Sequence, residues 1–375
     1  MKERIEVGIL YSRSGGYALI SEACRGGALA AIADINSDPA CPIEIVAVER
    51  DPQGNVDRYA PLCEDILVNS SAHHIVGCVT SWSRKEAIPV IEKRGGTLWY
   101  ACPYEGFEAN DHVVYTHACP NQHLVPLIAW VARRHGPNGF LLGSNYIWGW
   151  ETNRVARDLI ADAGGDVLGE RYLALGDKDV ARLIDEIRAV RPSFILNNLI
   201  GPSSYAFLEA YAGLGREDAY FRPESCPILS CNLSESELPA LSGIADGNLV
   251  VGPYFRNAAQ AQGWPLAGRR RCVSSFEAAA YTAVVILAEV LAAAPAAGRR
   301  LDLPAAFAGR RFVSPYGTVE VDPRTQHLSL PVVIGRVNGT EVDALDVTQS
   351  VAPDPYLSRY DRAGVFGRPA LRVVS

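Results

Sequence analysis

The sequence has no basic tract and no low-complexity segment, although it is 375 residues long. Its 35 Lys and Arg residues are outnumbered by 42 Asp and Glu residues, and the net charge is −7. The short arginine clusters at 269–271 and 299–300 lack interleaved aromatic residues, which is typical of solvated surfaces. The sequence therefore offers no positively charged surface for nucleic acid. Its 48% hydrophobic and 21% charged residues are typical of a globular protein, and its length is sufficient for two domains.

Motifs for catalysis and metal binding are also missing. The chain contains no G-x-S-x-G elbow, no Walker loop and no zinc-ligand spacing. His73 and His74 are adjacent on a predicted strand, so they point to opposite faces and cannot readily chelate one ion. Cys102 has no histidine nearby in the sequence, which favours a buried, inert thiol over a nucleophile. We therefore expect a protein that is not an enzyme and that has no metal or cofactor.

The nine cysteines are scattered, odd in number and without C-x-x-C spacing. This pattern disfavours a disulfide framework. The chain enters a strand near Ile5 without a preceding apolar leader segment. We expect a cytoplasmic protein, or a periplasmic one if a signal peptide has been removed. The most apolar segment, residues 278–297, is interrupted by Glu289 and Pro295, which predicts a buried helix rather than a membrane span.

The pattern that is present is a repeated alternation of strand and helix. It predicts strands at 5–11, 43–49, 74–79, 97–100 and 113–115, with helices between them, and a glycine, Gly27, that permits close packing of the first helix. After Pro120 a second run begins, with strands at 140–142, 166–172, 193–197 and 226–231. Such alternation requires parallel sheets covered by helices. We expect an α/β fold with two doubly wound lobes.

The later segments suggest how the lobes are divided. The chain crosses between lobes near residues 117–122, a strand near 248 marks a second crossing, and a long helix near 275–294 packs on the first lobe. The predicted lobes are therefore 1–119 plus 248–330 and 120–247 plus 331–375. Short β segments follow residue 311 and offer a surface for self-association. The Pro and Gly content of the tail from Pro353 disfavours a terminal helix.

Polar and aromatic residues gather where two neighbouring strands of the first lobe end. The strand at 74–79 is followed by Ser81, which is well placed to cap the next helix and leave its backbone N–H groups free. The strand ending at Tyr100 continues into Cys102, Pro103 and Tyr104. Because ligands of open parallel sheets bind at the carboxyl ends of the strands, this edge is a candidate binding wall.

The second lobe supplies further candidates. Tyr146 and Trp148 follow a strand end, and Ser203 begins a helix after another strand. Tyr254 lies near the second crossing, where a role in hinge packing is equally compatible with the sequence. In the first loop, Ser12, Ser14 and Tyr17 surround a glycine pair, and whether they contact a ligand is left open. Glu235 and Glu237 are more typical of a surface helix N-terminus than of a ligand site.

Several short motifs are spread over almost the whole chain. They are DPQG at 51–54, DRY at 57–59, VGC at 76–78, SRK at 83–85, YEGFE at 104–108, PNQ at 120–122, GSNYI at 143–147, Glu151, Asn153, PYF at 253–255 and DPY at 354–356. In this order they resemble the type I periplasmic-binding-protein superfamily, and within it the amide-responsive regulators of amidase operons and the urea- and amide-binding proteins of ABC transporters.

The resemblance implies two lobes joined by a three-strand hinge, which close on a small ligand as in a Venus flytrap. It implies that Ser81, Tyr100 and Tyr146 bind or enclose a small amide. Val79 stands where that pattern has tyrosine, and Cys102 where it has threonine, which favours a less polar ligand than acetamide. Residues 117–121 contain no acidic group, which disfavours α-amino acids. The expected ligand-binding residues are Val79, Ser81, Tyr100, Cys102, Pro103, Tyr104, Tyr146, Trp148, Ser203 and Tyr254.

We therefore expect a non-enzymatic receptor for an amide, a urea or a similar small polar compound. As a cytoplasmic sensor it would transmit the closing of its lobes to a regulator partner, which in the resembled system is an RNA-binding antiterminator. As a periplasmic receptor it would deliver urea, amides or branched-chain amino acids to an ABC permease. An amide or nitrile hydrolase is the alternative from another class, but it needs an activated nucleophile that the sequence does not offer.

Overall fold

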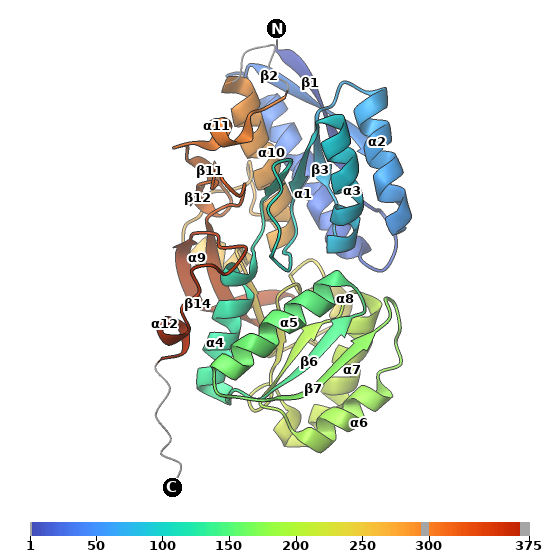
Figure 1. The fold of residues 1–375 in the computed structure, drawn as a ribbon, viewed down its shortest axis with the longest axis vertical. Helices are drawn as coiled ribbons and strands as arrows, with labels where there is room; N and C mark the ends of the chain where they lie inside the picture. The colour runs from blue at the N-terminus through green and yellow to red at the C-terminus, as the bar shows by residue number, and fades with distance from the viewer. Residues whose placement is uncertain (1, 294–299, 368–375) are drawn as a thin grey trace.

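The first lobe is built on a five-stranded parallel sheet. The computed structural model describes residues 2–293 and 300–367, and this lobe occupies the upper half of Figure 1. The strand order is β2-β1-β3-β4-β5, and every pairing is parallel. The strands are β1 Glu3–Leu10, β2 Ile43–Arg50, β3 His74–Gly77, β4 Thr97–Tyr100 and β5 Val113–Tyr115. The helices are α1 Ala18–Ser37, α2 Tyr59–Asn69, α3 Ser81–Arg94, α10 Ser275–Ala293 and α11 Leu303–Phe307.

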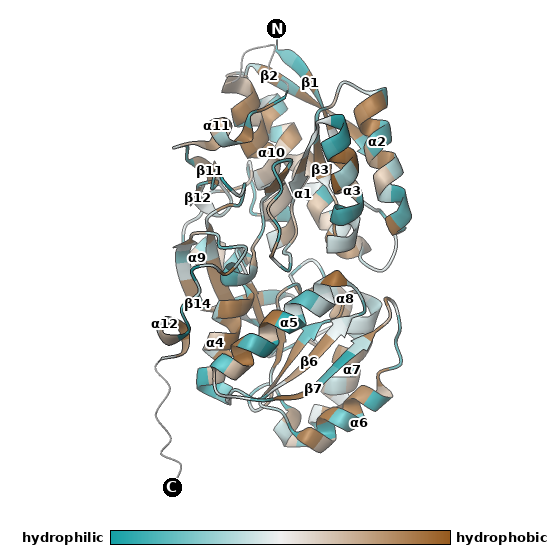
Figure 2. Ribbon diagram, viewed as in Figure 1, coloured by the Kyte–Doolittle hydropathy of each residue, from teal (hydrophilic) through white to brown (hydrophobic). Residues whose placement is uncertain are grey.

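The second lobe is built on a seven-stranded mixed sheet with the order β14-β13-β10-β9-β8-β6-β7. Its parallel strands are β6 Gly139–Ser144, β7 Val167–Leu173, β8 Phe194–Asn198, β9 Ile228–Ser230 and β10 Leu249–Gly252. An antiparallel hairpin, β13 Leu330–Asn338 and β14 Glu341–Val351, extends the sheet beside β10. The helices are α4 Leu124–His135, α5 Ile147–Asp162, α6 Ala181–Val190, α7 Pro202–Glu217, α8 Leu238–Leu241, α9 Arg256–Ala261 and α12 Arg362–Phe366. In Figure 2 strand β6 is coloured as hydrophobic, whereas much of α3 on the first lobe is hydrophilic.

The chain passes between the lobes at three places: between β5 and α4, between β10 and α10, and between the small hairpin β11–β12 (Phe312–Ser314 and Gly317–Val319) and β13. Gln122 ties two of these crossings together, because its side-chain amide donates to the backbone oxygens of Leu328 at 2.9 Å and Val351 at 2.8 Å. The predicted two-lobed α/β fold is confirmed. We propose lobe boundaries at these three crossings.

Two predicted details differ from the structure. Residues 248–330 were expected in the first lobe, but β10 pairs with β9 and β13 and so belongs to the second sheet. The tail was expected to have no helix, but α12 forms within it, because the Asp361 carboxylate accepts hydrogen bonds from the backbone N–H groups of Ala363 and Gly364. Residues 368–375 of that predicted tail lie outside the described residues.

Helix α10 is the predicted long helix, and it packs on the first lobe as expected, where its partner is α1. A Cβ at Gly27 of α1 would lie 2.2 Å from the backbone oxygen of Glu277, so the absence of a side chain permits this close approach. Among the described residues, α10 is the one helix long and apolar enough to cross a membrane, but 78% of its apolar window is buried. Figure 1 shows it inside the first lobe beside α1, which is the position of a core helix.

Candidate ligand-binding cleft

The carboxyl ends of the strands in the two sheets face each other across the gap between the lobes (Figure 1). A cavity of about 30 Å³, counted as the space that the centre of a water molecule can occupy, lies there. We call it the interlobe cavity. Within the described part of the chain, its lining comes from both lobes and includes no carboxylate, Lys or Arg: Tyr17, Ile20, Val79, Thr80, Ser81, Cys102, Pro103, Tyr146, Trp148, Ile200, Asn232 and Phe276.

The lobes touch each other beside this cavity. A Cβ at Gly201, in the turn before α7, would lie only 1.9 Å from the backbone oxygen of Gly16 in the first loop. On another side, the guanidinium carbon of Arg154 on α5 lies 4.5 Å from the ring centroid of Phe107. A space that admits roughly one or two water molecules and direct contact between the lobes together describe a closed cleft.

Ser81 lies in the first turn of α3, next to the residue that caps the helix. The cap is Thr80 rather than the predicted Ser81, because Thr80 has extended backbone angles and its side chain accepts the N–H of Ser83 at 3.2 Å. The hydroxyl of Ser81 instead donates a hydrogen bond to a carboxylate oxygen of Glu105. Its oxygen also accepts a hydrogen bond from Arg84 Nη1 at 3.3 Å.

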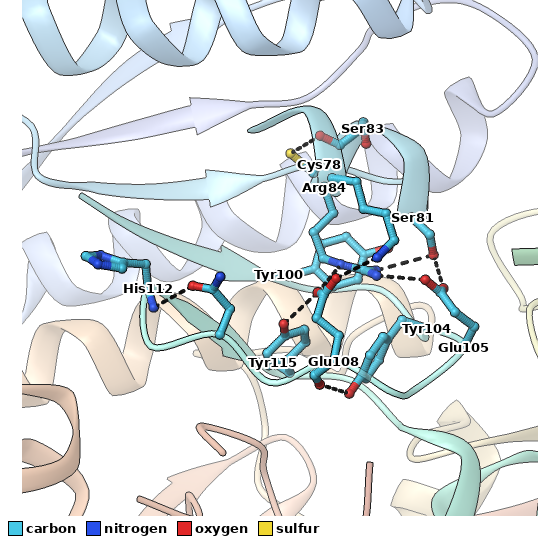
Figure 3. Close-up of polar contacts among 12 residues, drawn as sticks. Cys78, Ser81, Ser83, Arg84, Tyr100, Tyr104, Glu105, Glu108, His112 and Tyr115 are labelled. Atoms are coloured by element: carbon cyan, nitrogen blue, oxygen red, sulfur yellow. Dashed lines mark hydrogen bonds and ion pairs between the residues drawn. The ribbon is translucent and has the colours of Figure 1, made fainter. Parts of the chain in front are cut away.

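Behind Ser81 lies a buried ion-pair network formed by Arg84, Glu105 and Glu108 (Figure 3). Arg84 is fully buried, and its guanidinium contacts Glu105 at 2.9 Å and Glu108 at 2.8 Å. The guanidinium also lies over the rings of Tyr100 and Tyr104, at 4.8 and 4.9 Å from the ring centroids. Both carboxylates are therefore held by a permanent positive charge.

The charges in this network set the protonation of Glu108. Burial raises the pKa of its carboxyl, but the charge of Arg84 and hydrogen bonds from Lys85 and Tyr115 outweigh burial, and the pKa falls to about 2. Lys85 Nζ lies 2.8 Å from Glu108 and the Tyr115 hydroxyl 2.7 Å. Two carboxylates are balanced by Arg84 and Lys85, so the network presents little net charge to the cavity.

Two aromatic side chains of the second lobe complete the opposite wall. Tyr146 is the residue immediately before α5, and Trp148 lies in the first turn of α5. Both side chains are buried. Among the described residues, the buried indole nitrogen of Trp148 has no hydrogen-bond partner. A buried N–H group without a partner costs free energy.

Cys102 lies between the cavity and another thiol, with its sulfur 4.0 Å from that of Cys24. Burial raises the pKa of Cys102 well above its ordinary value, so the thiol stays protonated. All nine cysteines are free, and among residues 2–293 and 300–367 no group of His, Cys, Asp or Glu is arranged to hold a metal ion. Cys102 thus contributes a small, weakly polar surface.

The structure brings six of the ten expected residues together around the cavity: Val79, Ser81, Cys102, Pro103, Tyr146 and Trp148. The other four lie elsewhere, and their side chains bond to the protein itself. The Tyr100 hydroxyl donates to the Val79 backbone at 3.4 Å, and that of Tyr254 donates to Cys272 at 2.9 Å. Ser203 donates to Ala174 at 3.4 Å, and the Tyr104 hydroxyl contacts Glu108 and His327.

Other lining residues were not among the expected ten. Tyr17 follows the glycine pair after β1, and Asn232 and Ile200 follow strand ends, so the sequence indicated that these three positions lie near the binding edge. Ile20 and Phe276 lie within helices, and nothing in the sequence indicated that they line the cavity. The expected surface position of Glu235 and Glu237 is wrong: both are buried, and burial raises the pKa of their carboxyls to about 8 and about 7.

Comparison with known proteins agrees with this architecture. The model of the periplasmic binding protein domain family matches residues 5–362. "Leu/Ile/Val-binding protein homolog 6" of Brucella abortus is 22% identical over 351 residues, which cover 89% of this chain and 87% of the relative. A solute-binding protein of an ABC transporter from R. palustris, in complex with benzoate, aligns with a TM-score of 0.81 at 17% identity and covers 94% of this chain and 98% of its own. The branched-chain amino acid transporter substrate-binding protein LivJ from Streptococcus pneumoniae, in complex with isoleucine, gives 0.77 at 17% identity, with 94% and 100% covered. This chain belongs to the periplasmic binding protein domain family.

Proposed function

We propose that the chain is a non-enzymatic solute receptor that encloses a small ligand in the interlobe cavity and delivers it to a membrane permease. The observation that supports this most is the cavity itself, because its wall is built from both lobes and can be completed only when they close. Family membership supports binding rather than catalysis. On this proposal the protein works in the periplasm, where the permease receives the solute.

For the ligand, we propose an uncharged compound with one small polar group and an apolar body, with primary amides and substituted ureas first. The lining is mostly apolar and aromatic, and its polar members are hydroxyl, thiol, amide and indole groups. Such a wall suits a neutral ligand that needs orientation by a few hydrogen bonds. The resemblance of several sequence motifs to those of amide-responsive regulators and urea-binding proteins supports the same ligand class.

Two other ligand classes follow from the comparisons, in which solved relatives hold isoleucine or benzoate. An α-amino acid brings an ammonium group, and the lining offers no carboxylate to pair with it. A benzoate is chemically compatible with an aromatic wall, but it brings a negative charge that no Arg or Lys of the described lining would pair with. On this proposal, both classes therefore rank behind a neutral amide.

A second candidate function is that of a cytoplasmic sensor, which transmits the closing of its lobes to an RNA-binding antiterminator. The nine free cysteines favour it, because reduced thiols persist in a reducing compartment. The ligand chemistry is the same in both functions. Ligand-dependent binding to the permease, or to the antiterminator, separates them.

A thermal-shift screen tests the proposal with four panels: primary amides, ureas, benzoates and branched-chain amino acids. A compound that binds only the native state stabilises it, by about 2.7 kcal/mol at a concentration of 100 times its Kd. We expect amides or ureas to raise the melting temperature most. Turnover of a bound amide would refute the receptor function, and stabilisation by amino acids alone would refute the ligand class.

A further inference from the structure

Ser81 is a polar group of the interlobe cavity, and its neighbours fix its hydrogen-bond role. Its hydroxyl has one hydrogen and two lone pairs. The hydrogen is directed to Glu105, and one lone pair accepts the N–H of Arg84 at 3.3 Å. What Ser81 retains for a ligand is an acceptor position.

Glu105 cannot reverse this arrangement while it is paired with Arg84. One of its oxygens accepts from Arg84 Nη2 at 2.9 Å and the other accepts from Ser81. An ionised carboxylate only accepts hydrogen bonds, and a guanidinium only donates them. Figure 3 shows Arg84, Ser81 and Glu105 forming a closed triangle of contacts on the end of α3. Glu105 is 2% exposed and does not line the cavity, so it acts on a ligand through Ser81.

Trp148 on the opposite wall carries a hydrogen-bond donor. It is 3% exposed, its indole N–H has no partner among the described residues, and an indole nitrogen donates only. At Ser81, by contrast, the cavity offers an acceptor, so the ligand has to supply the donor. A primary amide or a urea has at least one NH₂ group that can donate to Ser81. A carboxylate of the same shape has two acceptors, and one of them would face the Ser81 lone pair with Glu105 behind it.

We infer that Glu105 is a positioning residue that holds Ser81 as an acceptor, so that the cleft selects ligands that donate a hydrogen bond and rejects the matching carboxylates. The inference rests on the proposed function, because it needs a ligand enclosed in the interlobe cavity. On this inference, primary amides and ureas are the ligand class because the Ser81 hydroxyl group can only accept a hydrogen bond from a ligand.

The test uses matched pairs of almost identical shape: propionamide with propionate, and benzamide with benzoate. Isothermal titration of the purified chain measures both members of each pair at pH 7. We expect at least one amide to bind about tenfold more tightly than its carboxylate, a modest ratio for a site built to pair a polar group. The affinity ratio, rather than either affinity, is the readout.

The variant Glu105→Gln separates positioning from structural support. The glutamine amide can donate to Ser81 and release its hydrogen toward the ligand, so the amide-to-carboxylate ratio should fall several-fold. The control is Glu108→Gln, which also removes an ion pair with Arg84 but has no contact with Ser81. We expect this control to leave the ratio unchanged. Circular dichroism and thermal melting establish that both variants are folded.

Three results would overturn the inference. Carboxylates that bind the wild-type chain as tightly as amides would show that Ser81 does not impose this polarity, while the receptor function would stand. Equal changes of the ratio in both variants would assign the effect to charge rather than to Ser81. Binding of neither member of either pair refutes the selection for amides, and the proposed receptor function fails as well only if all four screening panels are also negative.

Discussion

Replacement of Gly201 by alanine tests whether the closed cleft is the ligand-bound state. The new Cβ would lie 1.9 Å from the backbone oxygen of Gly16, whereas real Cβ atoms essentially never come closer than 3.0 Å. The lobes would have to move apart locally by more than an ångström. Gly201 also has φ +56° and ψ −132°, a region that non-glycine residues sparsely populate and that costs them roughly 1–3 kcal/mol of stability. The clash acts on closure, whereas the backbone strain acts on the second lobe in any state.

Two control variants separate these effects. Gly176→Ala also introduces backbone strain, at φ +84°, but its Cβ meets no atom within 4 Å, so it should lower stability and leave affinity unchanged. Gly16→Ala lies on the facing loop, where its Cβ would meet Pro202 at an ordinary 3.4 Å, and should change neither.

Calorimetric titration with the tightest amide or urea from the screen measures the outcome. We expect Gly201→Ala to weaken binding by at least about tenfold, or about 1.4 kcal/mol, and small-angle scattering to show a more extended particle with ligand present. Unchanged affinity in a folded Gly201→Ala variant would refute the reasoning, because the contact with Gly16 would then not belong to the ligand-bound state.

Two further predictions concern single side chains. Tyr146→Ala removes a buried aromatic wall of the interlobe cavity, and we expect it to weaken binding of the same ligand by about 1–3 kcal/mol while circular dichroism stays native; unchanged calorimetric affinity would remove Tyr146 from the site. The carboxyl of Glu108 has a pKa of about 2 in the folded chain, below the value of about 4.3 in an unfolded one. Its stabilising effect is therefore complete above about pH 5 and is lost as the pH falls toward 2, with a total of about 3 kcal/mol. Urea unfolding of the wild type and Glu108→Gln should differ most near neutral pH and converge in acid, and a difference independent of pH would contradict the assignment.

The alternation of strands and helices was predictable because each element carries a local signal. A strand is indicated by a short run of β-branched residues, and a helix by the spacing of its apolar residues and by the glycine that ends it. All of these features lie within the element itself. Gly27 was predicted to permit close packing, and the close approach of Glu277 confirms this. The lobe to which β10 belongs was not predictable, because a strand sequence of Leu249–Gly252 is compatible with either sheet.

The site was predictable only where its residues follow strand ends. Trp148 and Trp150 illustrate the limit: both follow β6, but two residues along a helix turn the side chain to another face, so Trp148 lines the cavity and Trp150 is 47% exposed. Thr80 and Ser81 both carry hydroxyls, and the backbone angles at Thr80 decide which one caps α3. The pairing of Arg84 with Glu105 depends on the approach of helix α3 and the loop after β4, which spacing in the sequence does not encode.

The packing of α10 on α1 has a consequence for how the chain is made. During synthesis the strands and helices of the first 119 residues emerge first, but the helix that covers the apolar side of α1 at Gly27 is Ser275–Ala293. The lobe that carries Ser81 therefore remains incomplete, with apolar surface in water, while the ribosome makes most of the second lobe. The first lobe to be translated therefore waits for a helix that is made after most of the second lobe. A chain that stops before residue 293 lacks part of the core helix of the lobe at its beginning as well as the β13–β14 hairpin of the lobe at its end.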